Sequence, residues 1–246
     1  MLHRYASKYR QLWDRHWWWR SRRTFVRRLV RNLTLPEGAN VLDIGCGDGL
    51  FFDELGKLGE VYGIEPDARL ISDDNPNRDR IEVTPFGPSY QTERRYDLIT
   101  MLDVLEHIED DRGTLERVHS LLAPGGYLVM TVPAMKWLWS MHDVANQHYR
   151  RYTRGELGGK ISEQGMELKR CGYTFGWTVG AMLARRAIAP ARDTQGTHEA
   201  DTYEVHTPPA PINMTLYGLT RLEQTVTRPF GTPFGSSAYA VARKAA

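Results

Sequence analysis

A short glycine-rich loop is the first segment of this chain that could do chemistry. Three glycines alternate in Gly45-Cys46-Gly47-Asp48-Gly49, directly after the apolar run Val41-Leu42-Asp43-Ile44. A glycine has no Cβ, so a ligand can lie against the backbone of such a loop and accept hydrogen bonds from its amide groups. The loop departs from the nicotinamide fingerprint Gly-x-Gly-x-x-Gly, because Leu50 stands where the third glycine belongs.

Two carboxylates accompany the loop and narrow the choice of ligand. Asp43 stands just before the loop, where it would repel a pyrophosphate and attract a cation. Glu65 follows Gly45 by 20 residues, at the end of the next expected strand, where a carboxylate can accept two hydrogen bonds from a ribose diol. Each bond to a charged acceptor is worth about 1.5–3 kcal/mol. A ligand with a ribose, a positive charge and no phosphate fits S-adenosylmethionine; a nicotinamide oxidoreductase is the alternative.

A second group of reactive side chains lies in residues 137–152, after the expected fifth strand. His142 and His148 are both candidates for a general base that deprotonates an acceptor hydroxyl, with Asp143 as the group that orients the base. The alternative is that this segment only braces the loop against the rest of the fold. The two histidines are six residues apart, which suits neither a helical metal-binding pair nor a zinc motif, so no metal is predicted.

Aromatic side chains that could line an acceptor pocket occur in the same segment and near the N-terminus. The predicted acceptor-binding residues are His16, Trp17, Trp18, Trp137, Trp139 and Tyr149.

The hydrophobic patterning predicts the elements that must position these groups. Strands are expected at 41–44, 60–64, 81–84, 96–101, 127–132, 166–175 and 237–243, and helical patterns at 25–33, 50–58, 112–122, 153–164, 177–189 and 214–226. Thr153 and Glu156 are expected to form a capping box, and the segment 190–211 is expected to be mobile. Tyr5, Tyr9, Trp13 and Trp17 recur every fourth residue, which predicts one aromatic face on an N-terminal helix. Strands that alternate with helices indicate a parallel sheet covered on both faces.

Five ordered motifs give the chain a family resemblance. They are residues 41–49, 63–66, 96–99, 103–108 and 122–126. In this order and spacing they resemble the motifs of class I S-adenosylmethionine-dependent methyltransferases, most of all the ubiquinone-biosynthesis-like branch that acts on small molecules. The resemblance implies an α/β, Rossmann-like, seven-stranded and mostly parallel sheet with an antiparallel last strand. It also implies S-adenosylmethionine as cofactor and S-adenosylhomocysteine as product.

The resemblance also assigns cofactor-binding roles by position. Asp43 and the glycine loop would hold the methionine end, Glu65 the ribose, and the end of the fourth strand would close over the cofactor. Many relatives have an acid after the third strand, whereas this chain has Thr84-Pro85-Phe86-Gly87, so Phe86 is expected to stack on adenine. The full predicted set is Asp43, Gly45, Cys46, Gly47, Gly49, Glu65, Pro66, Phe86, Leu102, Asp103 and His107.

Composition and charge set further limits. The 246 residues hold 32 Lys and Arg against 30 Asp and Glu, and only two cysteines, which are too few for a disulfide framework or a four-cysteine zinc site. Residues 1–31 contain ten Lys and Arg against one acid, whereas the remainder contains 22 against 29. Three interpretations of this basic arm remain open: a solvated face, a site for an anionic substrate, or a contact with an anionic membrane surface. No nucleic-acid partner is predicted, because no known module accompanies the patch.

These observations combine into a predicted organisation. Residues 1–37 form a helical cap, 38–175 the cofactor-binding core, 176–236 a lid insertion and 237–246 the last strand of the core. The longest uncharged apolar stretch, 171–184, is shorter than the ~20 residues of a spanning helix, so a cytoplasmic enzyme is expected. We expect methyl transfer to a small or medium organic acceptor, with oxygen favoured over nitrogen or carbon. A lipid-linked acceptor and a non-catalytic binding protein are the alternatives.

Overall fold

The computed structural model describes residues 2–188 and 206–245. The proline-containing segment 190–211, which its sequence predicts to be mobile, lies mostly outside these residues.

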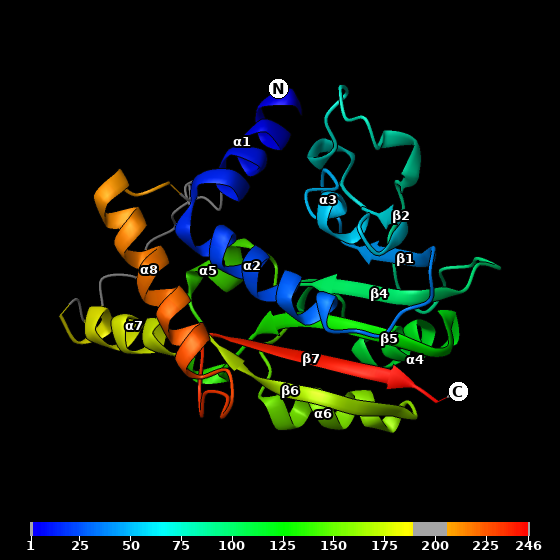
Figure 1. The fold of residues 1–246 in the computed structure, drawn as a ribbon. Helices are drawn as coiled ribbons and strands as arrows, with labels where there is room; N and C mark the ends of the chain where they lie inside the picture. Colours follow the sequence, from blue (N-terminus) through cyan, green and yellow to red (C-terminus); the bar gives the residue numbers. More distant parts are fainter. Residues whose placement is uncertain (1, 189–205, 246) are drawn as a thin grey trace.

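One seven-stranded sheet organises the chain, with the order β3-β2-β1-β4-β5-β7-β6 (Figure 1). β7 runs antiparallel to both of its neighbours and all other strands are parallel, as the resemblance implies. The strands are β1 (Ala39–Ile44), β2 (Gly59–Ile64), β3 (Ile81–Glu82), β4 (Tyr96–Leu102), β5 (Leu122–Pro133), β6 (Met166–Thr174) and β7 (Ser237–Lys244).

The strand order reverses direction at β1, because β2 lies on one side of β1 and β4 on the other. In open α/β sheets this reversal opens a binding site at the carboxyl ends of the strands. The strand boundaries differ from expectation by one or two residues, and by more at the start of β5. β5 begins at Leu122 rather than at Tyr127, because the Pro124-Gly125-Gly126 segment belongs to the strand instead of preceding it.

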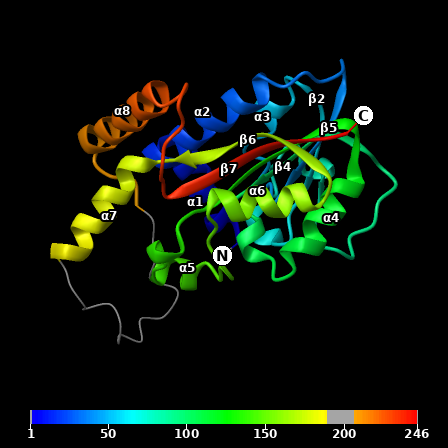
Figure 2. The same ribbon diagram turned by 90° about the horizontal axis from the view of Figure 1, so that it is seen from below.

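Helices cover both faces of the sheet, as Figures 1 and 2 show. On one face α4 and α6 bury Leu115, Leu157 and Ile161 against β1, β4 and β5; on the other, α2 and α3 bury Val26 and Leu55. The helices are α1 (Leu2–Arg15), α2 (Trp17–Arg31), α3 (Phe52–Leu55), α4 (Asp111–Leu121), α5 (Met141–Ala145), α6 (Arg154–Glu163), α7 (Gly176–Ile188) and α8 (Ala210–Val226).

The N-terminal region is two helices with a break, which corrects the prediction of one aromatic face through Trp17. His16 has an extended backbone, and its side chain accepts a hydrogen bond from the amide of Trp18, so Trp17 starts α2 instead of continuing α1. Trp13 stays on α1 and packs on Phe51 in the core, with ring centroids 6.0 Å apart.

The helices α4 and α6 lie within one residue of their predicted bounds. The capping box expected at Thr153 and Glu156 is present: Thr153 Oγ1 accepts from the Glu156 amide, and the Glu156 carboxylate accepts from the Thr153 amide. α8 begins four residues before its predicted start at Met214 and ends at the predicted Val226. The helices within the described ranges include none that is both long and apolar enough to cross a bilayer.

Candidate active site

The glycine loop lies at the carboxyl end of β1, beside the end of β2. The amides of Gly45 and Cys46 donate to the Ile64 carbonyl at 2.8 and 3.2 Å, which joins the loop to β2. Gly45, Gly47 and Gly49 all have positive φ, at 70°, 55° and 65°. A Cβ on Gly47 would meet no atom within 4 Å, so open space lies over the loop. The helix expected after the loop is reduced to the single turn α3.

Asp43 is buried directly below the loop, with 3% of its surface exposed. Its Oδ1 accepts a hydrogen bond of 2.6 Å from the Thr100 hydroxyl of β4. Burial raises the pKa of Asp43 to about 7, against the opposing effects of the Thr100 bond and the Arg22 charge. A cation bound nearby would stabilise the charged form of a carboxylate at this depth, and a cation is what the sequence predicts for the ligand.

Glu65 lies directly after β2, at the strand end where the sequence predicts it. Its carboxylate accepts from the amides of Gly47 and Asp67, each at 2.9 Å, so it joins the glycine loop to the turn after β2. Burial raises the pKa of Glu65, and these two hydrogen bonds oppose that rise. Each carboxylate oxygen keeps a further lone pair for a ligand hydroxyl.

Asp48, within the glycine loop, has a structural role that the sequence reading missed. It is buried and accepts hydrogen bonds from the Ser72 amide, the Ser72 hydroxyl and the Asn75 amide group, at 2.9, 3.0 and 2.7 Å. Arg10 of α1 also contacts its carboxylate. These contacts fix the loop to the segment after β2 and to the N-terminal cap. No motif spacing marks Ser72 or Asn75, so only the fold brings them to Asp48.

Arg22 belongs to the basic arm, but it does not lie on a solvated face. Its side chain is buried, and Nη2 lies 2.7 Å from Oδ2 of Asp103 at the end of β4. Asp103 has a φ of 57°, which is unusual for a residue other than glycine, and its Oδ1 accepts from Thr131 at 3.0 Å. The Nε of Arg22 has no hydrogen-bond partner among the described residues. A buried guanidinium with a spare donor is therefore placed at the candidate cofactor site.

The segment after β5 forms a network around Asp143. His148 Nδ1 lies 2.9 Å from Asp143 Oδ1, and Arg151 donates to both carboxylate oxygens at 2.7 and 2.9 Å. Burial would raise the pKa of Asp143, but the bonds to His148 and Arg151 outweigh it and lower that pKa. An ionised Asp143 can only accept, so Nδ1 of His148 carries the proton of this hydrogen bond.

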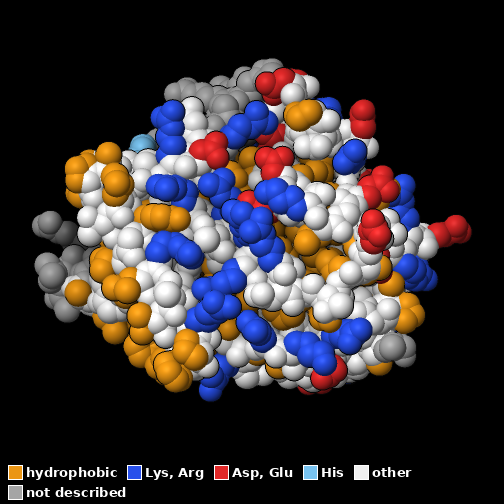
Figure 3. Space-filling view, viewed as in Figure 1, with side chains coloured by type: hydrophobic (Ala, Val, Ile, Leu, Met, Phe, Trp, Pro, Cys, Tyr) orange, Lys and Arg blue, Asp and Glu red, His pale blue; other side chains and the backbone are white. Residues whose placement is uncertain are grey.

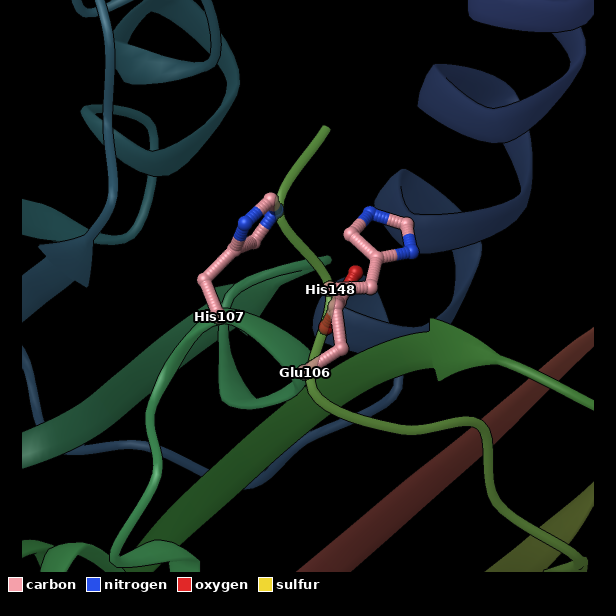
Figure 4. A group of neighbouring side chains, drawn as sticks. All are labelled: Glu106, His107 and His148. Atoms are coloured by element: carbon pink, nitrogen blue, oxygen red, sulfur yellow. The ribbon is translucent and has the colours of Figure 1, made fainter. Parts of the chain in front are cut away.

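The same histidine faces the end of β4 (Figure 4). The Glu106 cluster, which consists of Glu106, His107 and His148, brings three ligand-type atoms within 4.8 Å of one another, a spacing at which these residues could hold a cation. Glu106 is fully buried, neither of its oxygens has a hydrogen-bond partner in the described chain, and burial raises its pKa well above the usual range. The Tyr149 amide donates to the Glu106 carbonyl at 2.8 Å, which joins the segment to the turn after β4.

His142 lies at the edge of this network, with its ring centroid 6.2 Å from that of His148. Trp137, Trp139 and Tyr149 are exposed on the same segment. His16, Trp17 and Trp18 lie on the N-terminal cap, where Trp18 stacks on Phe175 and the Trp17 ring lies 5.4 Å from that of Trp177.

The remaining predicted cofactor residues differ in exposure. Cys46 and Phe86 are buried, and the Phe86 ring lies 5.3 Å from Tyr90 in the core, so its role beside adenine stays a prediction. Leu102 is partly buried against the core, and Pro66 is exposed beside Glu65.

Comparisons with known proteins agree with this geometry. A family model described as a methyltransferase domain matches residues 18–169, more than half of the chain. The ubiquinone biosynthesis O-methyltransferase of Rhodopseudomonas palustris strain TIE-1 is 30% identical over 116 residues, 45% of this chain and 46% of that protein. The chain thus spans about half the length of the curated relatives it matches.

Solved structures share the fold over nearly the whole chain. The N-methyltransferase NodS from Bradyrhizobium japonicum, in complex with S-adenosylhomocysteine, has a TM-score of 0.56 at 17% identity and covers 98% of each chain. A Haloferax volcanii methyltransferase, solved in complex with the Trm112 methyltransferase activator, has a TM-score of 0.61 at 15% identity and covers 99% of this chain and 95% of that one.

Fold and site together define a Rossmann-like α/β protein with the glycine loop and strand-end acids of class I S-adenosylmethionine-dependent methyltransferases. The chain belongs to the methyltransferase-domain family, and S-adenosylmethionine is its cofactor.

Proposed function

We propose that this protein transfers the methyl group of S-adenosylmethionine to a hydroxyl oxygen of a small or medium organic acceptor. The observation that carries this proposal is that Asp43 and Glu65 lie at the carboxyl ends of β1 and β2, while the segment after β5 carries the His148–Asp143 pair. The oxygen acceptor is also favoured by the similarity to ubiquinone biosynthesis O-methyltransferases.

Four groups would hold the cofactor. The open space over Gly47 would let the cofactor lie against the backbone of the glycine loop. Glu65 would accept hydrogen bonds from the ribose hydroxyls, and Asp43 would face the cationic amino acid end of the cofactor. Arg22 would bind the carboxylate of that end, because its buried guanidinium retains an unused Nε donor. The bound cofactor supplies an electrophilic methyl group on a sulfonium sulfur.

The residues of the chain then need only to align the acceptor, remove one proton and exclude water. Nε2 of His148 would take the proton of the acceptor hydroxyl while the new oxygen–carbon bond forms and the sulfur–carbon bond breaks. Asp143 holds the proton on Nδ1 and stabilises the imidazolium that results, and Arg151 keeps Asp143 in place. His142 is the second candidate for this base.

The acceptor would lie under the N-terminal cap and the helices α7 and α8. The amides of Gly176 and Trp177 donate to Glu223 of α8 at 2.8 and 2.9 Å, so α7 and α8 form one unit. That unit meets the cap through the Trp17–Trp177 and Trp18–Phe175 ring contacts. Trp137, Trp139 and Tyr149 would contact the acceptor from the opposite segment.

The test is methyl transfer from labelled S-adenosylmethionine to a panel of phenols, alcohols and amines. We expect labelled products with hydroxyl acceptors and loss of at least 100-fold in kcat for His148→Gln, with unchanged affinity for S-adenosylhomocysteine. Transfer only to amines or carbon would contradict the oxygen acceptor. Tight cofactor binding with no turnover on any acceptor would favour a non-catalytic binding protein.

A further inference from the structure

α8 has its polar and apolar faces reversed with respect to the rest of the protein. The side chains that it buries are Asn213, Thr220 and Gln224, whereas all its large aliphatic side chains except the half-buried Leu216 are exposed. A helix that packs on a protein core normally does the opposite. The reversal therefore needs a physical reason.

Hydrogen bonds explain the buried face. Asn213 accepts from the Trp17 amide at 2.8 Å and donates to the Arg15 carbonyl at 2.7 Å, which caps the break between α1 and α2. Thr220 accepts from Nε1 of Trp177 at 3.1 Å. These directional contacts to α2 and α7 hold α8 in one rotation about its axis, so the exposure of its aliphatic face is a fixed property of the fold.

Four of the exposed side chains lie along one side of the helix, and a fifth, Met214, lies on another side. Ile212, Leu219, Leu222 and Val226 are between 47% and 61% exposed. Their positions fall within an arc of about 80° around the helix, at 100° per residue. The apolar ridge is defined as these four residues together with Phe230 and Phe234 after the helix, which are 88% and 47% exposed. Contiguous apolar surface of this kind on a soluble protein marks an interaction site.

The charges around the ridge identify the partner. Between residues 206 and 236 the sequence has one acid, Glu223, and this side chain is bound to the amides that begin α7. Arg228 is exposed just after α8, Arg221 is half-buried and donates to Gln224 at 2.8 Å, and the arginine-rich α2 packs beside α8. Figure 3 shows hydrophobic side chains gathered over α7 and α8, next to Lys and Arg side chains over α2.

We propose that the apolar ridge of α8 docks on an anionic lipid bilayer, with its aliphatic side chains among the acyl chains and the arginines at the phosphate level. The proposed contact surface centres on α8 and not on the basic N-terminal arm alone, in which Arg22 is buried against Asp103. The residues proposed for membrane docking are surface residues outside the proposed methyl-transfer site. Failure of the docking proposal therefore leaves the methyl-transfer proposal unchanged, and the reverse also holds.

The test is co-sedimentation of the full chain with vesicles of phosphatidylcholine, with and without one quarter phosphatidylglycerol. We expect binding to the anionic vesicles that weakens in high salt, and at least tenfold weaker binding for Leu219→Glu combined with Leu222→Glu. Val83→Glu is the matched control, because Val83 is also an exposed aliphatic residue but lies next to β3 at the far edge of the sheet. It should bind within twofold of the unmodified protein.

A second double variant tests the proposal independently in case Leu219→Glu combined with Leu222→Glu misfolds. Arg221→Gln combined with Arg228→Gln leaves the apolar ridge intact and should weaken anionic binding by about fivefold per arginine. Affinity for S-adenosylhomocysteine and the thermal midpoint are measured for every variant. Equal vesicle binding by all variants, or no vesicle binding, overturns the proposal. A dimer that the ridge double variant dissociates would assign the ridge to a second copy and also overturns it.

Discussion

The burial of Asp43 makes a specific prediction about pH. Because its pKa is raised to about 7, Asp43 gains its charge across the neutral range instead of near pH 4. It would be about one tenth ionised at pH 6 and about nine tenths at pH 8. If only the ionised form attracts the cationic end of S-adenosylmethionine, the dissociation constant should rise about tenfold as pH falls from 8 to 6.

Equilibrium dialysis with labelled S-adenosylmethionine measures this effect, and Asp43→Asn is the matched variant. Asparagine keeps the shape and can still accept from Thr100. Its affinity should lie near the low-pH level of the unmodified protein and should change less than twofold between pH 6 and 8. A flat profile for the unmodified protein, or the same slope in both proteins, would refute the assignment of Asp43.

The other predictions concern the ribose contact, the base, a metal and one helix cap. Glu65→Gln should weaken S-adenosylhomocysteine at least tenfold by calorimetry, since a neutral acceptor loses about 1.5 kcal/mol or more; an unchanged titration would contradict the ribose contact. His148→Gln should remove far more turnover than His142→Gln, and the reverse order would move the base to His142. A chelator should leave turnover unchanged, whereas loss that a divalent cation restores would place an ion at the Glu106 cluster. Thr153→Ala should cost about 1 kcal/mol and lower the thermal midpoint by about 2–4 °C, and an unaltered melt would show that the cap is redundant.

Sequence reasoning reached the parts of the site that depend on local order along the chain. The glycine loop, Asp43 and Glu65 each follow a strand whose apolar run is visible in the sequence, and parallel pairing then brings them to one edge of the sheet. The capping box of α6 is local in the same way.

The features that were missed depend on contacts between distant segments. Arg22 reads as one more arginine in a basic arm, and only the packing of α2 over β4 turns it toward Asp103. The break at His16 depends on Asn213, nearly 200 residues away, which binds the exposed ends of both helices. The reversed faces of α8 have the same origin, because partners outside the helix decide which of its residues become buried.

A crystal structure of the protein with S-adenosylhomocysteine tests the central claim most directly. The account predicts the ribose hydroxyls within hydrogen-bond distance of Glu65 and the homocysteine end between Asp43 and Arg22. Density for the nucleoside elsewhere on the protein, or no density beside the glycine loop at saturating ligand, would contradict it.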